Sequence, residues 1–225
     1  MYFNRKRSDV RLDMISRDEQ GEIAHKSMTS RTHERLSNAI ITARFRPGEK
    51  LKIEALTDEF DASLGAVREA LARLTSEGLV SARPQRGFFV ALISRRDLID
   101  LTETRIEIEQ TCLASSITHG DLTWEGRVLS IGHQLSKLSV GLHDRGGNDS
   151  NEWHKYHQRF HEEITAACAN SWWLKLRQQL FIQSERYRRL SGPLNENGRD
   201  IDAEHRAIME SVLARDITTA RALLA

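Results

Sequence analysis

The sequence lacks the features that mark membrane-spanning and secreted proteins. Its 225 residues contain no run near the roughly 18 uncharged apolar residues that a spanning helix needs. The basic N-terminal segment has no apolar stretch behind it, so we expect no secretory signal. Only two cysteines occur, Cys112 and Cys168, both in apolar helical surroundings, which is typical of buried thiols in a reducing compartment. The sequence therefore predicts a cytoplasmic protein of ordinary globular composition.

The chain also has no large excess of positive or negative charge, and its formal net charge is only +1. The distribution of charge along the chain is more informative. Residues 1–96 carry 18 Lys and Arg against 13 Asp and Glu, a formal charge of +5. Residues 97–225 carry 15 against 19, a formal charge of −4. A basic first part joined to an acidic second part favours a nucleic-acid-binding head on a separate domain.

Residues 56–90 predict two short helices followed by a β-hairpin. The apolar positions at helical spacing are Leu56, Phe60, Val67, Leu71 and Leu74. Ser63 stands where the second helix would begin and can cap it, and Gly78 follows its end. Strand-like runs at 79–81 and 88–90 flank a basic turn. This order is typical of a winged helix, whose second helix enters a DNA major groove while the wing lies against the backbone or minor groove.

The remaining residues predict helices apart from the first 28. Residues 1–28 are polar and predict a flexible arm, whose basic residues at 5–7 either touch DNA phosphates or stay solvated. A helix from about Thr29 is expected to end before Pro47. Further helices are expected to begin at Asp97, Leu122, Asn151, Ser171, Ile201 and Asp216, with Asp97 and Asp216 as N-caps. A loop is expected at 141–150, and no strand beyond the wing.

The predicted fold class is therefore mainly α. An N-terminal winged helix-turn-helix would occupy residues 29–93, after the arm at 1–28. An all-helical C-terminal bundle would occupy residues 94–225.

Several motifs resemble the GntR family of bacterial transcription factors, in the FadR-like branch whose sensor is a helical FCD domain. In the head they are RFRPGEKL (44–51), LTDEF (56–60), VREAL (67–71), RLTSEGLV (73–80) and QRGFFV (85–90). In the bundle they are Arg105 with Glu109, then Phe160, His161, Ile164 and Asn170, then Glu204, His205 and Ile208. The phrases SLGAVREAL and HQRFH are most similar to the subgroup of the carbon-starvation-induced regulator of glutarate and aminobutyrate catabolism.

The resemblance implies a ligand-responsive transcriptional regulator rather than an enzyme or a membrane protein, with residues 94–225 serving ligand sensing and dimerisation. Such a protein would be a repressor that binds a palindromic double-stranded DNA operator as a homodimer and is released by a small carboxylate effector. A metal-sensing regulator, with the ion itself as effector, remains open as an alternative. A metalloenzyme is disfavoured because the sequence has no H-E-x-x-H base and no nucleophile motif.

The resemblance also implies a set of DNA-contacting residues. They are Lys52, Ser63, Leu64, Gly65, Arg68, Arg73, Arg86 and Gly87. Arg68 would reach a base edge or a phosphate from the second helix, with Glu69 either orienting it or serving as a surface acid. Family members often carry an Arg directly after the capping Ser, whereas this chain has Leu64. One base contact would therefore be absent, or replaced by an apolar contact with a thymine methyl. Arg83 joins Lys52 and Arg73 as a candidate phosphate contact.

Histidines dominate the candidate metal site. His154, His157 and His161 follow one another at spacings of three and four, so they lie near one face of a predicted helix. His157 and His161 can bind one ion, and His205 on a later helix can provide a third ligand. The resembled domain usually has Asp at the position of His157, and a further His about two residues beyond Ala225. Zn²⁺ is the default divalent metal for these ligands, with Ni²⁺ or Mn²⁺ as alternatives.

Three further residues are predicted to bind the effector: Arg105, Asn170 and Tyr187. Two of them have an alternative that the sequence leaves open. Arg105 can pair with Glu109 one turn along its helix, and Asn170 can cap the helix that begins at Ser171. The aromatic residues Trp153, Tyr156, Phe160, Trp172 and Trp173 are expected to pack in the core rather than to form a ligand cage.

Overall fold

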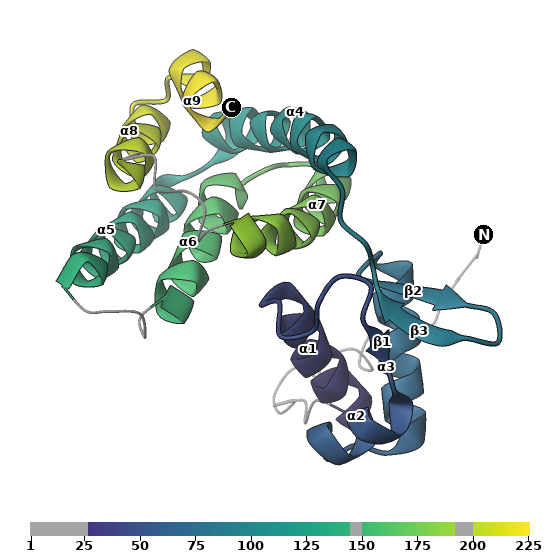
Figure 1. The fold of residues 1–225 in the computed structure, drawn as a ribbon. Coiled ribbons are helices and arrows are strands. Elements are labelled where there is room, and N and C mark those ends of the chain that lie inside the picture. Colours follow the sequence, from purple (N-terminus) through teal and green to yellow (C-terminus); the bar gives the residue numbers. More distant parts are fainter. Residues whose placement is uncertain (1–26, 145–149, 192–199) are drawn as a thin grey trace, which may run out of the picture.

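The computed structural model describes residues 27–144, 150–191 and 200–225, which form an N-terminal head and a larger helical domain (Figure 1). The head contains α1 (Met28–Ile41), β1 (Lys50–Leu51), α2 (Ile53–Phe60), α3 (Leu64–Ser76), β2 (Val80–Arg83) and β3 (Gly87–Val90). The second domain contains α4 (Arg95–His119), α5 (Leu122–Asp144), α6 (Ser150–Thr165), α7 (Ser171–Ser191), α8 (Ile201–Leu213) and α9 (Ile217–Leu224). The predicted mainly α fold is confirmed. Of the arm predicted at residues 1–28, residues 1–26 lie outside the described residues, and Met28 already begins α1.

Helices α2 and α3 form the predicted helix-turn-helix. The side chain of Ser63 caps α3 by accepting a hydrogen bond from the Ala66 amide at 3.2 Å, as expected. Gly78 follows the end of α3 with φ +77°, a left-handed conformation that glycine adopts without strain. The inward face of α3 joins the core of the head: Ala66, Val67, Ala70, Leu71 and Leu74 are all buried. The outward face of α3 is thereby left to solvent.

A three-stranded antiparallel sheet completes the head, in the order β1-β3-β2. The predicted hairpin is confirmed, with Val80 opposite Val90 and Arg83 opposite Gly87. The strand β1 was not predicted, because two residues are too few to show an alternating pattern. It pairs with β3 through Lys50 opposite Phe89. The wing is therefore held on one side by the segment that precedes the helix-turn-helix.

The second domain has its own hydrophobic core, in which Trp124, Phe160 and Ile164 are almost fully buried. Among the described residues of either domain, no helix is long and apolar enough to cross a membrane. Cys112 and Cys168 are both buried free thiols. Burial and the neighbouring Cys168 raise the pKa of Cys112 to about 12, so it stays a thiol at neutral pH.

Several predicted helix limits need correction. Ser94 rather than Asp97 caps α4, because the Ser94 side chain accepts from the Asp97 amide at 3.1 Å. Helix α5 continues to Asp144 into the predicted loop, of which residues 145–149 lie outside the described part. The predicted N-cap Asp216 is confirmed, since its carboxylate accepts from the Thr219 amide at 3.0 Å.

Candidate functional site

The outward face of α3 presents the residues predicted to contact DNA. Ser63, Leu64, Gly65, Arg68 and Arg73 are all exposed, and Leu64 keeps 49% of its surface. A Cβ added at Gly65 would have no neighbour within 4 Å, so this glycine leaves open space beside Arg68. The carboxylate of Glu69 accepts a hydrogen bond from Thr29 at 3.4 Å, so it faces α1. In the described part of the chain Arg68 has no ion pair, which leaves its guanidinium available to a ligand.

The wing adds a second basic edge. Arg86 lies exposed in the turn between β2 and β3, and the exposed Gly87 begins β3 with φ +90°. Arg83 stacks over the Phe89 ring, with its Cζ 4.2 Å from the ring centroid. Lys52 is exposed at the N-cap position of α2. The predicted DNA-contacting residues thus lie on α3, on the wing and at the start of α2, with the side chains of Lys52, Arg68, Arg73 and Arg86 free to approach a phosphate backbone.

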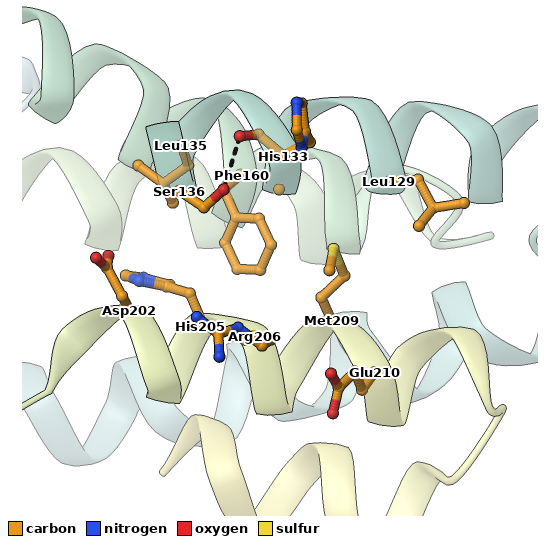
Figure 2. A pocket seen from close by; sticks show the side chains of 11 residues that line it. Leu129, His133, Leu135, Ser136, Phe160, Asp202, His205, Arg206, Met209 and Glu210 are labelled. Atoms are coloured by element: carbon orange, nitrogen blue, oxygen red, sulfur yellow. Dashed lines mark hydrogen bonds between the residues drawn. The ribbon is translucent and has the colours of Figure 1, made fainter. Parts of the chain in front are cut away.

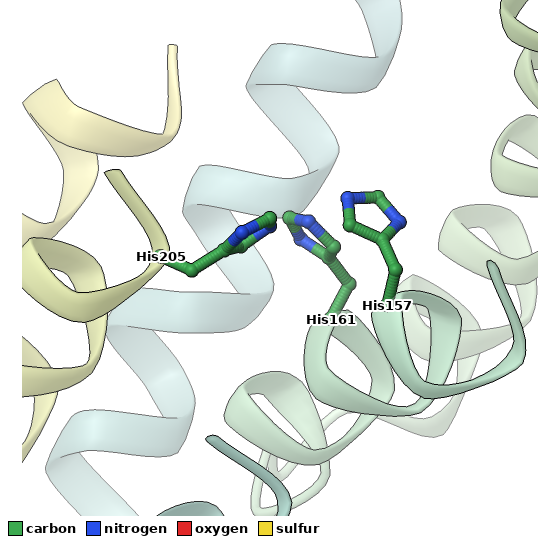
Figure 3. Close-up of side chains that lie close together, drawn as sticks. All are labelled: His157, His161 and His205. Carbon is green, nitrogen blue, oxygen red and sulfur yellow. The ribbon is translucent and has the colours of Figure 1, made fainter. Parts of the chain in front are cut away.

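The three histidines predicted as metal ligands meet in the second domain (Figure 3). His157 and His161 project from α6, and His205 projects from α8 toward them. One nitrogen from each ring lies within 4.8 Å of the others. His154, one turn earlier, points elsewhere, because its Nδ1 lies 2.9 Å from the Arg188 guanidinium. The exclusion of His154 from the predicted ligand set therefore agrees with this geometry.

The electrostatic environment keeps these imidazoles neutral. Burial, and then nearby positive charge, lowers the pKa of His157 and of His161 well below the usual 6.5. Burial also lowers the pKa of His205. The Nδ1 atoms of all three are buried without a hydrogen-bond partner in the described part of the chain. Neutral imidazole nitrogens without partners are the donors that a divalent transition metal requires, so the residues present fit such an ion.

A buried charged cluster lies beside the histidines. Glu109 is 3% exposed and Arg177 is 2% exposed. Arg105 Nε donates to Glu109 Oε1 at 2.9 Å, and Arg177 Nη2 lies 3.8 Å from the same oxygen. Both guanidinium groups stack near the Phe181 ring, whose centroid is 6.4 Å from that of His161. The alternative pairing of Arg105 with Glu109 is therefore present, and it lies beside the histidines.

Sequence reasoning missed Arg177. Its Nε and Nη2 are buried without a hydrogen-bond partner among the described residues, which is costly for a cation. Burial lowers its pKa, although Glu109 opposes this effect. One signal was available in the sequence. Arg177 stands four residues before the buried Phe181, on the helix face where an apolar residue is expected.

The other two predicted effector residues have different partners. Asn170 Oδ1 accepts from the amides of Trp172 and Trp173 at 3.0 and 3.3 Å, so Asn170 caps α7. The hydroxyl of Tyr187 donates to Asp97 and accepts from the Ser94 amide at 3.3 Å. Neither polar group joins the histidine cluster, because each is already engaged elsewhere. Of the three candidates only Arg105 lies beside the histidines.

A cavity of about 280 Å³ lies between α5 and α8 (Figure 2). Its apolar wall includes Phe160 and Met209, and its polar rim includes His133 and Arg206. His205 belongs both to this wall and to the histidine cluster, and its ring centroid is 5.1 Å from that of Phe160. The volume is at the small end of ligand pockets, which span roughly 300–1,000 Å³.

Together, a winged helix-turn-helix on a helical domain with a histidine cluster defines a DNA-binding transcriptional regulator with a sensor domain. Comparison with known families agrees. Residues 28–90 match the model described as bacterial regulatory proteins, gntR family, and residues 100–225 match the FCD domain. The chain belongs to the gntR family of regulators that carry an FCD domain. The matched families and relatives are transcriptional regulators, not enzymes.

Individual relatives support this assignment. The chain is 38% identical over 199 residues to the uncharacterized HTH-type regulator BphR of Paraburkholderia xenovorans, covering 88% of this chain and 81% of that protein. It is 35% identical over 196 residues to the HTH-type transcriptional repressor GlaR of Escherichia coli, covering 84% of this chain and 87% of GlaR. The solved structure of E. coli McbR/YncC superposes with a TM-score of 0.74 at 18% identity, covering 88% of this chain and 92% of that one, which shows the same fold.

Proposed function

We propose that the protein is a repressor that binds a palindromic operator as a homodimer and leaves it when a small carboxylate binds at a metal centre in the FCD domain. The observation that carries this proposal is the meeting of His157, His161 and His205 next to two cations, the buried Arg177 and the partly buried Arg105. The similarity to GlaR, which is described as a repressor, supports the sign of regulation. A cytoplasmic location follows from this role.

The head supplies the DNA contacts in this proposal. Arg68 reads a base edge in the major groove, while Arg73, Lys52 and the wing residue Arg86 contact phosphates. Ser63, Leu64, Gly65 and Gly87 line the same surface without offering a charged donor. A winged head of this size covers one half-site, so a palindromic operator needs two copies related by a two-fold axis.

The three histidines hold the metal ion, for which Zn²⁺ is the default and Ni²⁺ or Mn²⁺ are alternatives. When bound, the ion supplies positive charge and at least one open coordination position. Two nitrogen atoms on one ion at bonds of about 2.0–2.1 Å are at most about 4.2 Å apart. One nitrogen from each ring lies within 4.8 Å of the others, so His157, His161 and His205 would hold the ion with only small side-chain rotations.

The charge balance around the site favours an anionic effector. Arg105 and Arg177 share the carboxylate of Glu109, and the metal adds two further positive charges beside neutral imidazoles. Among the described residues, Nε and Nη2 of Arg177 have no hydrogen-bond acceptor, and a carboxylate can provide one. The cavity next to His205 measures about 280 Å³ and has room for a small molecule, although its lining residues do not include Arg105 or Arg177.

The test measures operator affinity while metal and carboxylate are varied separately. Fluorescence anisotropy measures the binding of the protein to a promoter duplex. The metal-loaded protein and the protein treated with a chelator are each measured alone and with the straight-chain dicarboxylates from malonate to adipate. Release by a carboxylate only in the metal-loaded protein supports the proposal. His161→Ala should lose both metal and response, whereas His119→Ala, which removes an exposed histidine at the end of α4, should keep both.

Two other outcomes would overturn the proposal. Release by metal alone, at unchanged carboxylate concentration, would make the ion the effector and the protein a metal sensor. Carboxylates that act equally on the chelated protein would show that the histidine cluster does not bind the effector.

A further inference from the structure

Helix α7 touches both domains, and its two sets of contacts alternate within a few residues. Toward the charged cluster, Phe181 lies under the guanidinium groups and Ser184 Oγ accepts from Arg105 Nη1 at 3.1 Å. Toward the head, Ile182 packs against the hydrophobic core that contains α3. Successive residues of a helix point about 100° apart, so neighbours along α7 face different domains.

Gln183 reaches the end of the recognition helix. Its side-chain Nε2 donates to the backbone carbonyl of Glu77, the C-cap residue of α3. The last carbonyls of a helix lack partners within that helix, so this bond satisfies a group that α3 itself leaves open. The Glu77 carboxylate lies 2.9 Å from His33 of α1, and a Cβ on Gly78 would lie 3.2 Å from Gln183 Nε2. The junction is therefore closely packed around the end of the helix that carries Arg68.

The next residues of α7 hold the connection between the domains. The buried side chain of Arg186 donates to the carbonyl of Ala91 at 2.7 Å, just after the wing strand β3. The Tyr187 hydroxyl accepts from the amide of Ser94, the residue that caps α4. Both ends of the connecting segment 91–94 are thus bonded to α7.

We propose that residues 182–187 of α7 couple the effector site to the recognition helix, with Gln183 as the positioning residue for α3. The inference rests on the proposed function, because it places the effector at Arg105 and Arg177. A carboxylate that competes with Ser184 for Arg105 changes the contacts of α7 one residue away from Gln183. A shift of α7 then moves the donor that holds α3. An effector changes operator affinity only by as much as its binding differs between the two head placements.

The experiment compares Gln183→Ala and Gln183→Glu with Gln179→Ala, which removes an exposed glutamine one turn earlier on the same helix. The glutamate variant keeps most of the side-chain length but replaces the donor by an acceptor. For each full-length, metal-loaded protein, operator affinity is measured with and without the dicarboxylate of the malonate-to-adipate series that acts most strongly on the wild type. Carboxylate affinity is measured by calorimetry with and without operator, since coupling between two ligands is reciprocal.

We expect both Gln183 variants to keep the wild-type carboxylate affinity within about threefold in the absence of DNA. The ratio of operator dissociation constants with and without carboxylate should fall toward one in both variants and stay at the wild-type value in Gln179→Ala. A loss of helix packing alone would change the melting temperature without this reciprocal loss of coupling. Unchanged coupling in Gln183→Ala would overturn the inference.

A second measurement separates this inference from the proposed function. Hydrogen exchange of the amides in residues 74–80, measured without any carboxylate, reports whether α7 holds the end of α3. Exchange should be faster in Gln183→Ala than in Gln179→Ala. If no carboxylate in the series releases the wild-type protein from the operator, the proposed effector is wrong. The comparison of hydrogen exchange between the two variants then decides the inference alone. Equal exchange in the two variants would then refute it.

Discussion

Replacing Arg68 by alanine should remove most of the sequence discrimination of the head. Arg68 is exposed on the outward face of α3 and has no ion pair within the described residues. The neighbouring outward positions offer little to a base edge: Leu64 is apolar, Gly65 has no side chain, and Glu69 bonds to Thr29. Arg68 is thus the one cationic donor in the first two turns of this helix, where recognition helices meet bases.

The magnitude follows from the loss of one base contact per half-site. A bidentate contact is worth about 1–3 kcal/mol of discrimination, or roughly 5- to 150-fold in affinity. Two copies on a palindrome lose about 2–6 kcal/mol together, a large share of the roughly 4–10 kcal/mol that separates specific from non-specific binding. Folding should be preserved, because an exposed helix position accepts alanine at little cost.

The assay is fluorescence anisotropy on the operator and on a scrambled duplex at one fixed salt concentration, since phosphate contacts make both affinities salt-dependent. Arg68→Ala should lower the ratio of the two affinities at least tenfold while metal content stays unchanged. The matched control is Arg73→Ala in the last turn of α3, which should weaken both duplexes alike. A ratio within threefold of the wild type for Arg68→Ala, or a collapse of the ratio in Arg73→Ala instead, would refute this assignment of the reading residue.

Three further predictions concern the wing, the histidines and two glycines. Arg86→Ala should weaken operator and scrambled duplexes equally and reduce the slope of log affinity against log salt by about 0.9 per wing, measured by salt titration. In metal-free protein the folded-state pKa values of His157 and His161 lie below 6.5, so the unfolded chain binds more protons as pH falls. The free energy of unfolding, measured with urea, should then stay at its full value above about pH 6.5 and decrease as the pH falls below that value. Equal free energies of unfolding at pH 7.5 and pH 5 would contradict this prediction. In thermal melts, Gly126→Ala, which adds a methyl group in open space on α5, should raise stability by about 0.4–1 kcal/mol. Gly120→Ala should lower stability by about 1–3 kcal/mol, because its Cβ would lie 2.0 Å from the Trp124 ring.

The head could be predicted closely because its signals are local. Ser63 and Gly78 mark the two ends of α3 by capping chemistry that depends only on nearby backbone groups. His157 and His161 are also a local signal, since a spacing of four places them on one helix face. His205 lies 44 residues further along, and its assignment to the same cluster needed the resemblance to FCD domains.

The start of α4 shows where a local signal becomes ambiguous. Ser94 and Asp97 are both good capping residues three positions apart, and the sequence alone favoured Asp97. In the structure Ser94 caps the helix, because the Asp97 carboxylate is needed elsewhere as the acceptor for Tyr187. A similar competition engages the hydroxyl of Tyr187, which was predicted to bind the effector. Its hydroxyl bonds to the beginning of α4, about 90 residues earlier in the chain, which no local pattern can indicate.

The contacts of α7 that sequence reasoning missed share a physical cause. Arg177, Gln183 and Arg186 are polar residues on an amphipathic helix, and a sequence pattern assigns such residues to the solvent face. Their partners, Glu109 and the carbonyl groups of Glu77 and Ala91, belong to segments more than 60 residues away. Two of these partners are backbone carbonyls, which are independent of the amino acid at that position and leave no trace in the sequence. The contacts that join a sensor to its reading head are of this kind, so the link between the two domains becomes visible only once the chain is folded.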